Sequence, residues 1–181
     1  MSAENVELLR RYYDSWNAGD TDLVVSALAE KVEWHGHPRL PEPGPYGDPE
    51  AVGRWMNQFQ EAWEELRAEP VELLDAGDGL VALVHMTGRG RGSGLAVQGG
   101  VDVHVVGFQD GMVSFFRILP GDDAAELAGL EEHEMGLLVL RVQDGLTEEE
   151  IAERHGGDKT IASALAGAYE KLRRLPQEVI R

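Results

Sequence analysis

The 181-residue sequence contains no cysteine. Disulfide bonds, thiolate metal ligands and a cysteine nucleophile are therefore excluded. The sequence also lacks an apolar run of the roughly 18 residues that a membrane-spanning helix needs. Its first residues, MSAENVELL, have neither the basic nor the apolar segment of a signal peptide. A cytoplasmic protein with no membrane contact is the expectation.

Basic side chains are scarce. Lysine and arginine together number 16 against 33 acidic residues, which gives a formal net charge of −17 at pH 7. Such a surface repels nucleic acid and anionic lipid, although high acidity also serves simply to keep a protein soluble. A neutral, apolar small molecule is the partner that this charge allows best.

The first 35 residues predict two helices and a strand. The apolar positions of the first helix follow a 3.6-residue period at Val6, Leu9, Tyr13 and Trp16. Gly19 ends that helix, and Asp20 or Thr21 caps a second one through Leu28. A short strand, Val32–His35, follows.

A proline-rich loop between Gly36 and Glu50 precedes a third helix. Asp48 is its expected N-cap and Pro49 its first residue. The helix is predicted to run to about Arg67, with Pro70 beyond its end. Its apolar stripe comprises Val52, Trp55, Met56, Phe59, Trp63 and Leu66.

Four strands then form a predicted meander: Val71–Asp75, Leu80–Arg89, Leu95–Phe108 and Met112–Leu119. The turn sequences AGDG, GRGRGSG and QDG separate them, and a closing helix is expected over Asp122–Leu130. Helices followed by a strand meander are typical of an α+β fold rather than of a parallel α/β sheet.

Three segments, LLRRYYDSWNAGD from Leu8, VEWH from Val32 and HVVGFQDGMV from His104, resemble the SnoaL-like polyketide cyclase and ketosteroid isomerase group. This group belongs to the nuclear transport factor 2 (NTF2) superfamily, and the resemblance covers about Glu4 to Leu130. It implies a cone-shaped, curved antiparallel sheet packed on the N-terminal helices around a pocket. It also implies chemistry without a cofactor.

Residues 131–181 are predicted to form a second, helical domain after the cone domain of residues 1–130. Its helices are expected at about Glu131–Gln143, Thr147–His155 and Lys159–Leu172, and they resemble the helix-turn-helix of LuxR-type regulators and sigma factors. The turn is one residue short, however, and the segment holds 11 acidic and 7 basic side chains. No sequence-specific DNA binding is expected, because base reading and phosphate contacts need arginine, lysine and amide groups. Docking on the cone or on a second subunit is expected instead.

The strand Val101–Phe108 has a polar and an apolar face. Periodicity alone places its valines in the core and leaves Asp102 and His104 in solvent. The family resemblance implies the reverse, with Asp102 and His104 toward the cavity and the apolar side buried in a homodimer. That proposed dimer patch consists of Val101, Val103, Val105, Val113 and Phe115. Packing of the C-terminal helices over the same side is the alternative.

The resemblance assigns roles to two residues. Tyr12 matches the tyrosine with which ketosteroid isomerases donate a hydrogen bond to the enolate oxygen, and His104 falls near their second, neutral donor. A histidine with the ordinary pKa of about 6.5 can also move protons at neutral pH. Tyr12, His104 and Asp102 are therefore the candidate catalytic residues, with His104 as base or acid and Asp102 as its charge partner.

The known carboxylate positions of the family are not filled. Trp34 stands where the isomerases have their base, and Ile118 where polyketide cyclases have an aspartate. His85 and Thr87 fall close to the catalytic Arg and Asp of the epoxide hydrolases.

The candidate ligand-binding residues are Trp16, Trp34, Trp55, His85 and Phe116, each of which can also be plain core. His35 and His37 lack a third ligand at useful spacing, so no metal is expected. Two functions stay open: a cofactor-independent cyclase or isomerase, or a ligand-binding or regulatory module without catalysis.

Overall fold

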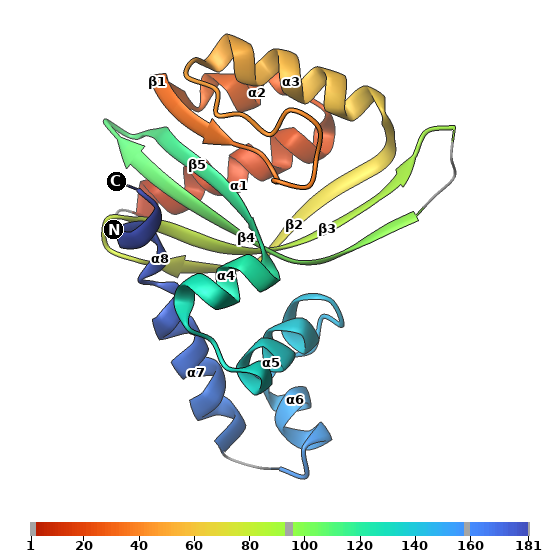
Figure 1. Cartoon of the computed structure of the whole chain (residues 1–181), viewed down its shortest axis with the longest axis vertical. Coiled ribbons are helices and arrows are strands. Elements are labelled where there is room, and N and C mark those ends of the chain that lie inside the picture. Colours follow the sequence, from red (N-terminus) through yellow and green to blue (C-terminus); the bar gives the residue numbers. More distant parts are fainter. Residues whose placement is uncertain (1–2, 93–95, 158–159, 181) are drawn as a thin grey trace.

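The computed structural model describes residues 3–92, 96–157 and 160–180 (Figure 1). Helices cover both faces of a five-stranded sheet. The first seven elements are α1 (Ala3–Ala18), α2 (Thr21–Ser26), β1 (Leu28–His35), α3 (Pro49–Glu61), β2 (Trp63–Asp75), β3 (Gly79–Gly90) and β4 (Ala96–Gln109). They are followed by β5 (Met112–Pro120), α4 (Gly121–Ala128), α5 (Glu132–Val142), α6 (Glu148–Arg154), α7 (Thr160–Leu172) and α8 (Leu175–Val179). Within the described ranges, no helix has the length and apolar character needed to cross a membrane.

The sheet has the strand order β1-β5-β4-β3-β2. Strands β2 to β5 form the predicted antiparallel meander, but β1 pairs with β5 in parallel, so the sheet is mixed. The chain leaves β1 through a long loop and α3 to reach the opposite edge of the sheet. No hairpin therefore forces β1 to run against its neighbour.

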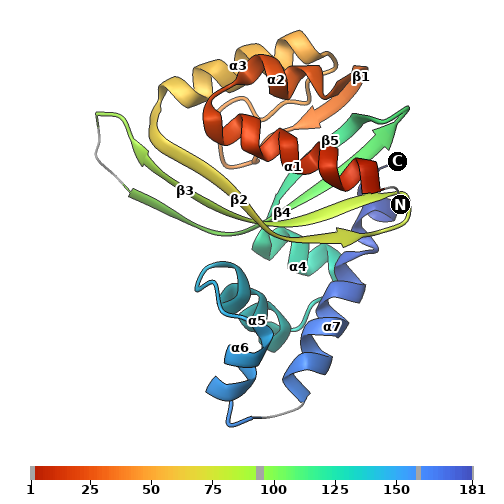
Figure 2. The same ribbon diagram turned by 180° about the vertical axis from the view of Figure 1, so that it is seen from behind.

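Helices α1 and α3 cover the concave face of the sheet (Figure 2). The predicted caps are present. The Asp20 side chain accepts a hydrogen bond from the Leu23 N–H, and the Asp48 side chain accepts one from the Ala51 N–H at 2.8 Å. These bonds satisfy amides that a helix start leaves without a partner, and both helices begin where the sequence predicts.

The boundary between α3 and β2 differs from the prediction. Helix α3 ends at Glu61, and β2 begins at Trp63, so Trp63 and Leu66 lie on a strand rather than on a helix. Pro70 lies inside this edge strand, next to one of its two register shifts. An edge strand with bulges tolerates a proline that a central strand would not.

The C-terminal helices cover the convex face. Val101, Val103, Val105 and Phe115 are buried against apolar residues of the tail, among them Leu137, Leu138, Leu165 and Leu172. The prediction of an open homodimer patch on this face is therefore wrong, because the tail of the same chain already covers it. Val113 is also misplaced in that patch. It belongs to the concave core, since the pairing of β4 and β5 shifts between Gly107 and Phe108.

The three predicted tail helices are present within one or two residues of their expected bounds; residue 159 lies outside the described residues. Thr147 and Glu150 form the expected capping box at the start of α6. Two ion pairs hold the tail together and to the sheet: Lys171 with Glu134 at 2.6 Å, and Arg141 of α5 with Glu72 of β2 at 2.5 Å. The tail is thus a docked layer of the molecule.

Candidate functional site

A cavity of about 420 Å³ lies between α1, α3 and the concave face of the sheet. Its walls are mostly aromatic and aliphatic, with few polar side chains among them. The aromatic wall comprises Tyr12, Tyr13, Trp16, Trp34, Trp55, Phe59, Trp63 and Phe116. The polar lining includes His37, Arg39, Asp102, His104, Asp122 and Gln143. A cavity of this size with few convergent polar groups is typical of small-molecule sites.

Seven of the eight candidate site residues line this cavity: Tyr12, Trp16, Trp34, Trp55, Asp102, His104 and Phe116. Their roles are not tested by this placement. His85 does not line the cavity. Its neighbours Val84 and Met86 pack in the concave core, and side chains alternate along a strand, so His85 points to the other face.

The tryptophans pack closely around the cavity. The ring centroids of Trp34 and Trp55 are 4.8 Å apart, and Trp34 also stacks on Phe116 at 5.8 Å. Trp55 in turn stacks on Phe59 at 5.0 Å. These rings together form a continuous aromatic surface.

His104 contacts Tyr13, the neighbour of the tyrosine that the resemblance selected. The Tyr13 hydroxyl lies 2.8 Å from Nδ1 of His104, and the imidazole is only 2% exposed. Burial, with a smaller contribution from His37, lowers the pKa of His104 to about 3. The expectation of an ordinary histidine pKa is therefore wrong, because this side chain is fully enclosed, and His104 is neutral at physiological pH.

The tautomer of His104 follows from its neighbours. Burial raises the pKa of Tyr13 well above its usual range, so the phenol keeps its proton. If that proton goes to Nδ1, the imidazole proton is on Nε2. The opposite tautomer would leave the buried phenol proton without an acceptor, which costs stability. Nε2 is buried and has no hydrogen-bond partner among the described residues.

Tyr12 has a different environment. Its hydroxyl accepts a hydrogen bond from Nε1 of Trp34 at 3.4 Å, and its ring stacks on Phe116. Burial raises the pKa of Tyr12, so this phenol is also neutral. Tyr12 can donate its proton to a ligand oxygen, as the resemblance implies.

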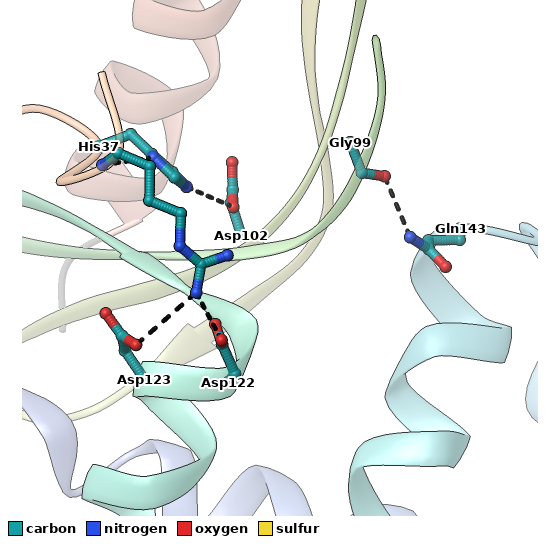
Figure 3. A network of polar contacts seen from close by, with 7 residues as sticks. His37, Gly99, Asp102, Asp122, Asp123 and Gln143 are labelled. Carbon is teal, nitrogen blue, oxygen red and sulfur yellow. Dashed lines mark hydrogen bonds and ion pairs between the residues drawn. The ribbon is translucent and has the colours of Figure 1, made fainter. Parts of the chain in front are cut away.

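Asp102 lies two residues before His104 on the same face of β4. Burial raises the pKa of Asp102 to about 7, and Arg39 only partly offsets this effect. Nε2 of His37 lies 3.6 Å from Oδ1 of Asp102 (Figure 3). Burial and Arg39 lower the pKa of His37, so this neighbour is a neutral imidazole rather than a cation at neutral pH.

The proline-rich loop positions His37 and Arg39 at the mouth of the cavity. The backbones of Trp34 and Tyr46 exchange two hydrogen bonds, which fold the loop back against β1. Arg39 then reaches Asp122 at the start of α4 at 2.5 Å. Arg39 was not among the candidate residues, and His37 was considered only as a metal ligand together with His35. His35 pairs with Glu33 instead of joining His37, so the two imidazoles have separate partners.

A curved sheet wrapped on helices, with a cavity between them, defines the NTF2-like class of pocket proteins. The model of the SnoaL-like domain matches residues 9–116, more than half of the chain. The protein therefore belongs to the SnoaL-like family of the NTF2-like superfamily. No protein with a curated description matches it.

Solved structures share the fold. An NTF2-like protein of unknown function from Burkholderia pseudomallei has 24% identity and a TM-score of 0.59, covering 71% of this chain and 98% of its own. A putative polyketide cyclase from Sinorhizobium meliloti has 22% identity and a TM-score of 0.51, covering 62% and 94%. TerC, co-crystallised with polyporic acid, has 18% identity and a TM-score of 0.57, covering 65% and 91%. The family match and these alignments leave much of this chain unmatched.

Proposed function

We propose that the cavity binds a neutral, mostly apolar carbonyl compound and that the protein moves a proton on it without a cofactor. The observation that carries this proposal is that Asp102 and His104 lie on the same face of β4 and both line an aromatic cavity. Enzymes that move protons need a base whose pKa lies near the working pH and a donor that stays neutral.

Asp102 is the proposed base. Its carboxylate takes a proton from the carbon next to the carbonyl group. The electron pair of that C–H bond forms a carbon–carbon double bond, and the π pair of the carbonyl group moves onto its oxygen. Nε2–H of His104 and the hydroxyl of Tyr12 donate hydrogen bonds to this oxygen as its charge develops. Asp102 then returns the proton to the substrate. This assignment moves the role of base from His104 to Asp102. The pKa of His104 is too low for its imidazole to accept a second proton near neutral pH.

Binding without catalysis is the second candidate. Trp34, Ile118 and Thr87 replace polar catalytic groups that the resemblance implies at these positions, and this leaves Asp102 as the base candidate. A structural relative crystallised with polyporic acid supports a small-molecule ligand for the cavity under either candidate.

Deuterium incorporation separates the two candidates. β-Tetralone, a neutral bicyclic ketone, serves as the probe, and mass spectrometry follows its exchange in heavy water. We expect Asp102→Asn to lower the protein-dependent rate by about a hundredfold. The wild-type rate should rise as pH increases through about 7, because the carboxylate form of Asp102 is the base.

Asp14→Asn, which changes an exposed carboxylate of α1, is the matched control and should keep the wild-type rate. If β-tetralone quenches the cavity tryptophans but exchanges no faster than in buffer, the binding function is correct and the catalytic one is wrong.

A further inference from the structure

The cavity has an open end where β4 continues beyond β5. The pairing of these strands ends at Asp102 opposite Pro120, whereas β4 itself begins at Ala96. Gly99, Gly100 and Val101 of this extension line the cavity. A cone made only of the sheet and the N-terminal helices would leave this end open.

Helix α5 of the tail closes it. Met135, Val139 and Gln143 line the cavity, and their spacing of four residues places them on one side of the helix. Nε2 of Gln143 donates a hydrogen bond to the Gly99 carbonyl at 3.1 Å (Figure 3). The tail therefore supplies part of the cavity wall in addition to covering the convex face.

The contact at this end depends on a glycine. A Cβ at Gly121 would lie 2.5 Å from the carbonyl oxygen of Val101 and 2.7 Å from Cε of Met135. Only a residue without a side chain allows β4, the start of α4 and α5 to approach this closely.

Helix α5 is held firmly in this position. Leu137 and Leu138 of this helix are buried in the convex core, and Met135 and Val139 also pack partly against that core. Arg141 ties its C-terminal end to Glu72, and Glu134 ties its N-terminal end to Lys171. A wall anchored at both ends and along one side can discriminate between ligands by shape.

This wall lies outside the family match, which ends at residue 116. The similar structures described above cover between 62% and 71% of the chain. The contribution of α5 to the cavity is therefore an addition to the shared domain.

We infer that α5 is a specificity-determining wall of the ligand site, at which Met135, Val139 and Gln143 contact the far end of an elongated, neutral aromatic ligand. The side chain at position 139 sets the length that the cavity accepts, and the amide of Gln143 is available to a polar group at that end. This inference rests on the proposed binding of a small molecule, and it is independent of any proton transfer by Asp102.

Two neutral dyes of different length test the wall. β-Naphthol is short, and N-phenylnaphthylamine is long; energy transfer from the cavity tryptophans reports the binding of each. We expect Val139→Phe to lower the affinity for the long dye by about tenfold or more. The affinity for the short dye should change by less than about twofold, because we expect this dye not to reach α5. His133→Phe adds an aromatic ring on the exposed side of the same helix and should change neither affinity.

Val139→Ala keeps the test decisive if the larger side chain prevents folding. It enlarges the same end of the cavity, so it should change the affinity for the long dye and spare the short one. Unchanged affinity for the long dye in a folded Val139 variant would overturn the inference.

Phe59→Ala separates this failure from failure of the proposed binding function, because Phe59 lines the cavity on α3, where its ring stacks on Trp55. If this substitution lowers the affinity for both dyes while the Val139 variants leave the affinity for the long dye unchanged, the cavity binds ligands and α5 is not a specificity wall. If it weakens neither, the dyes bind elsewhere, and both proposals are wrong.

Discussion

Burial acts in opposite directions on the two polar side chains that β4 turns toward the cavity. It lowers the pKa of His104 to about 3 and raises the pKa of Asp102 to about 7. In each case the apolar surroundings favour the uncharged form, which is the deprotonated histidine and the protonated aspartate. At mildly acidic pH both groups are therefore neutral, and the charge of Asp102 appears only near neutrality.

This raised pKa makes stability depend on pH. An unfolded aspartate has a pKa of about 3.9, so between that value and about 7 the folded state keeps a proton that the unfolded state has lost. The free energy of unfolding should therefore fall as pH rises through this range. Asp102→Asn cannot ionise and should remove the fall. We expect it to be more stable than the wild type at about pH 8, by about 4 kcal/mol, and similar to it at about pH 4.

Urea denaturation across this pH range measures the effect. Asp14→Asn should instead follow the wild-type pH curve, since Asp14 is exposed. Parallel curves for Asp102→Asn and the wild type would contradict the buried, protonated state of this carboxyl group.

The family resemblance allowed a large part of the cavity to be predicted, because it placed Asp102 and His104 toward the cavity, whereas the periodicity of β4 alone left them in solvent. It did not identify Tyr13 as the partner of His104. Tyr12 and Tyr13 are adjacent on α1, and only the crossing angle of the helix over the sheet decides which hydroxyl reaches the imidazole. His85 was misplaced because its face depends on the register of β3, and no pattern within that strand marks the concave side.

At the level of the elements, the tail helices were easier to predict than the boundary between α3 and β2. Apolar residues in the tail repeat at helical spacing, and Thr147 and Glu150 mark a start. Residues around Trp63 and Leu66 keep the same spacing within a bulged strand, where a bulge mimics a helical period. The covering of the convex face could not be decided either, since a second subunit and the tail satisfy the same apolar pattern.

Glu134 helps to fix the geometry of α5. It is buried, its carboxylate accepts the Glu131 N–H at the start of the helix, and it pairs with Lys171 of α7. Glu134→Ala leaves both donors without this acceptor. We expect a loss of about 1–3 kcal/mol in the free energy of unfolding and faster hydrogen exchange in α5 and α7.

Glu132→Ala is the matched control, because Glu132 is an exposed acidic residue in the same turn. It should change the stability by less than about 0.5 kcal/mol. Equal effects of the two substitutions would show that the pair with Lys171 does not hold the tail helices together.

On the scale of the whole molecule, the tail covers two parts of the shared domain: the convex face of the sheet and the open end of the cavity. Its apolar side covers the valines of the convex face, and one side of α5 closes the cavity. A single docked layer thus links the apolar core beneath the sheet to the ligand site above it. A ligand that contacts α5 binds the state in which the tail is docked. Its binding should therefore also stabilise the docked tail.

Removal of the tail should convert the convex face into a self-association surface. A chain that ends at Leu130 exposes Val103, Val105 and Phe115, which are at most 5% exposed in the full chain. An apolar patch of this kind rarely remains open in water, so we expect the shortened chain to form dimers or larger species in light scattering. The full chain, of 19.9 kDa, should not associate through this face. Val103→Asp in the shortened chain should reduce the association, because it places a charge in the middle of the patch. A shortened chain that stays folded and monomeric at high concentration would show that the tail is dispensable for covering this face.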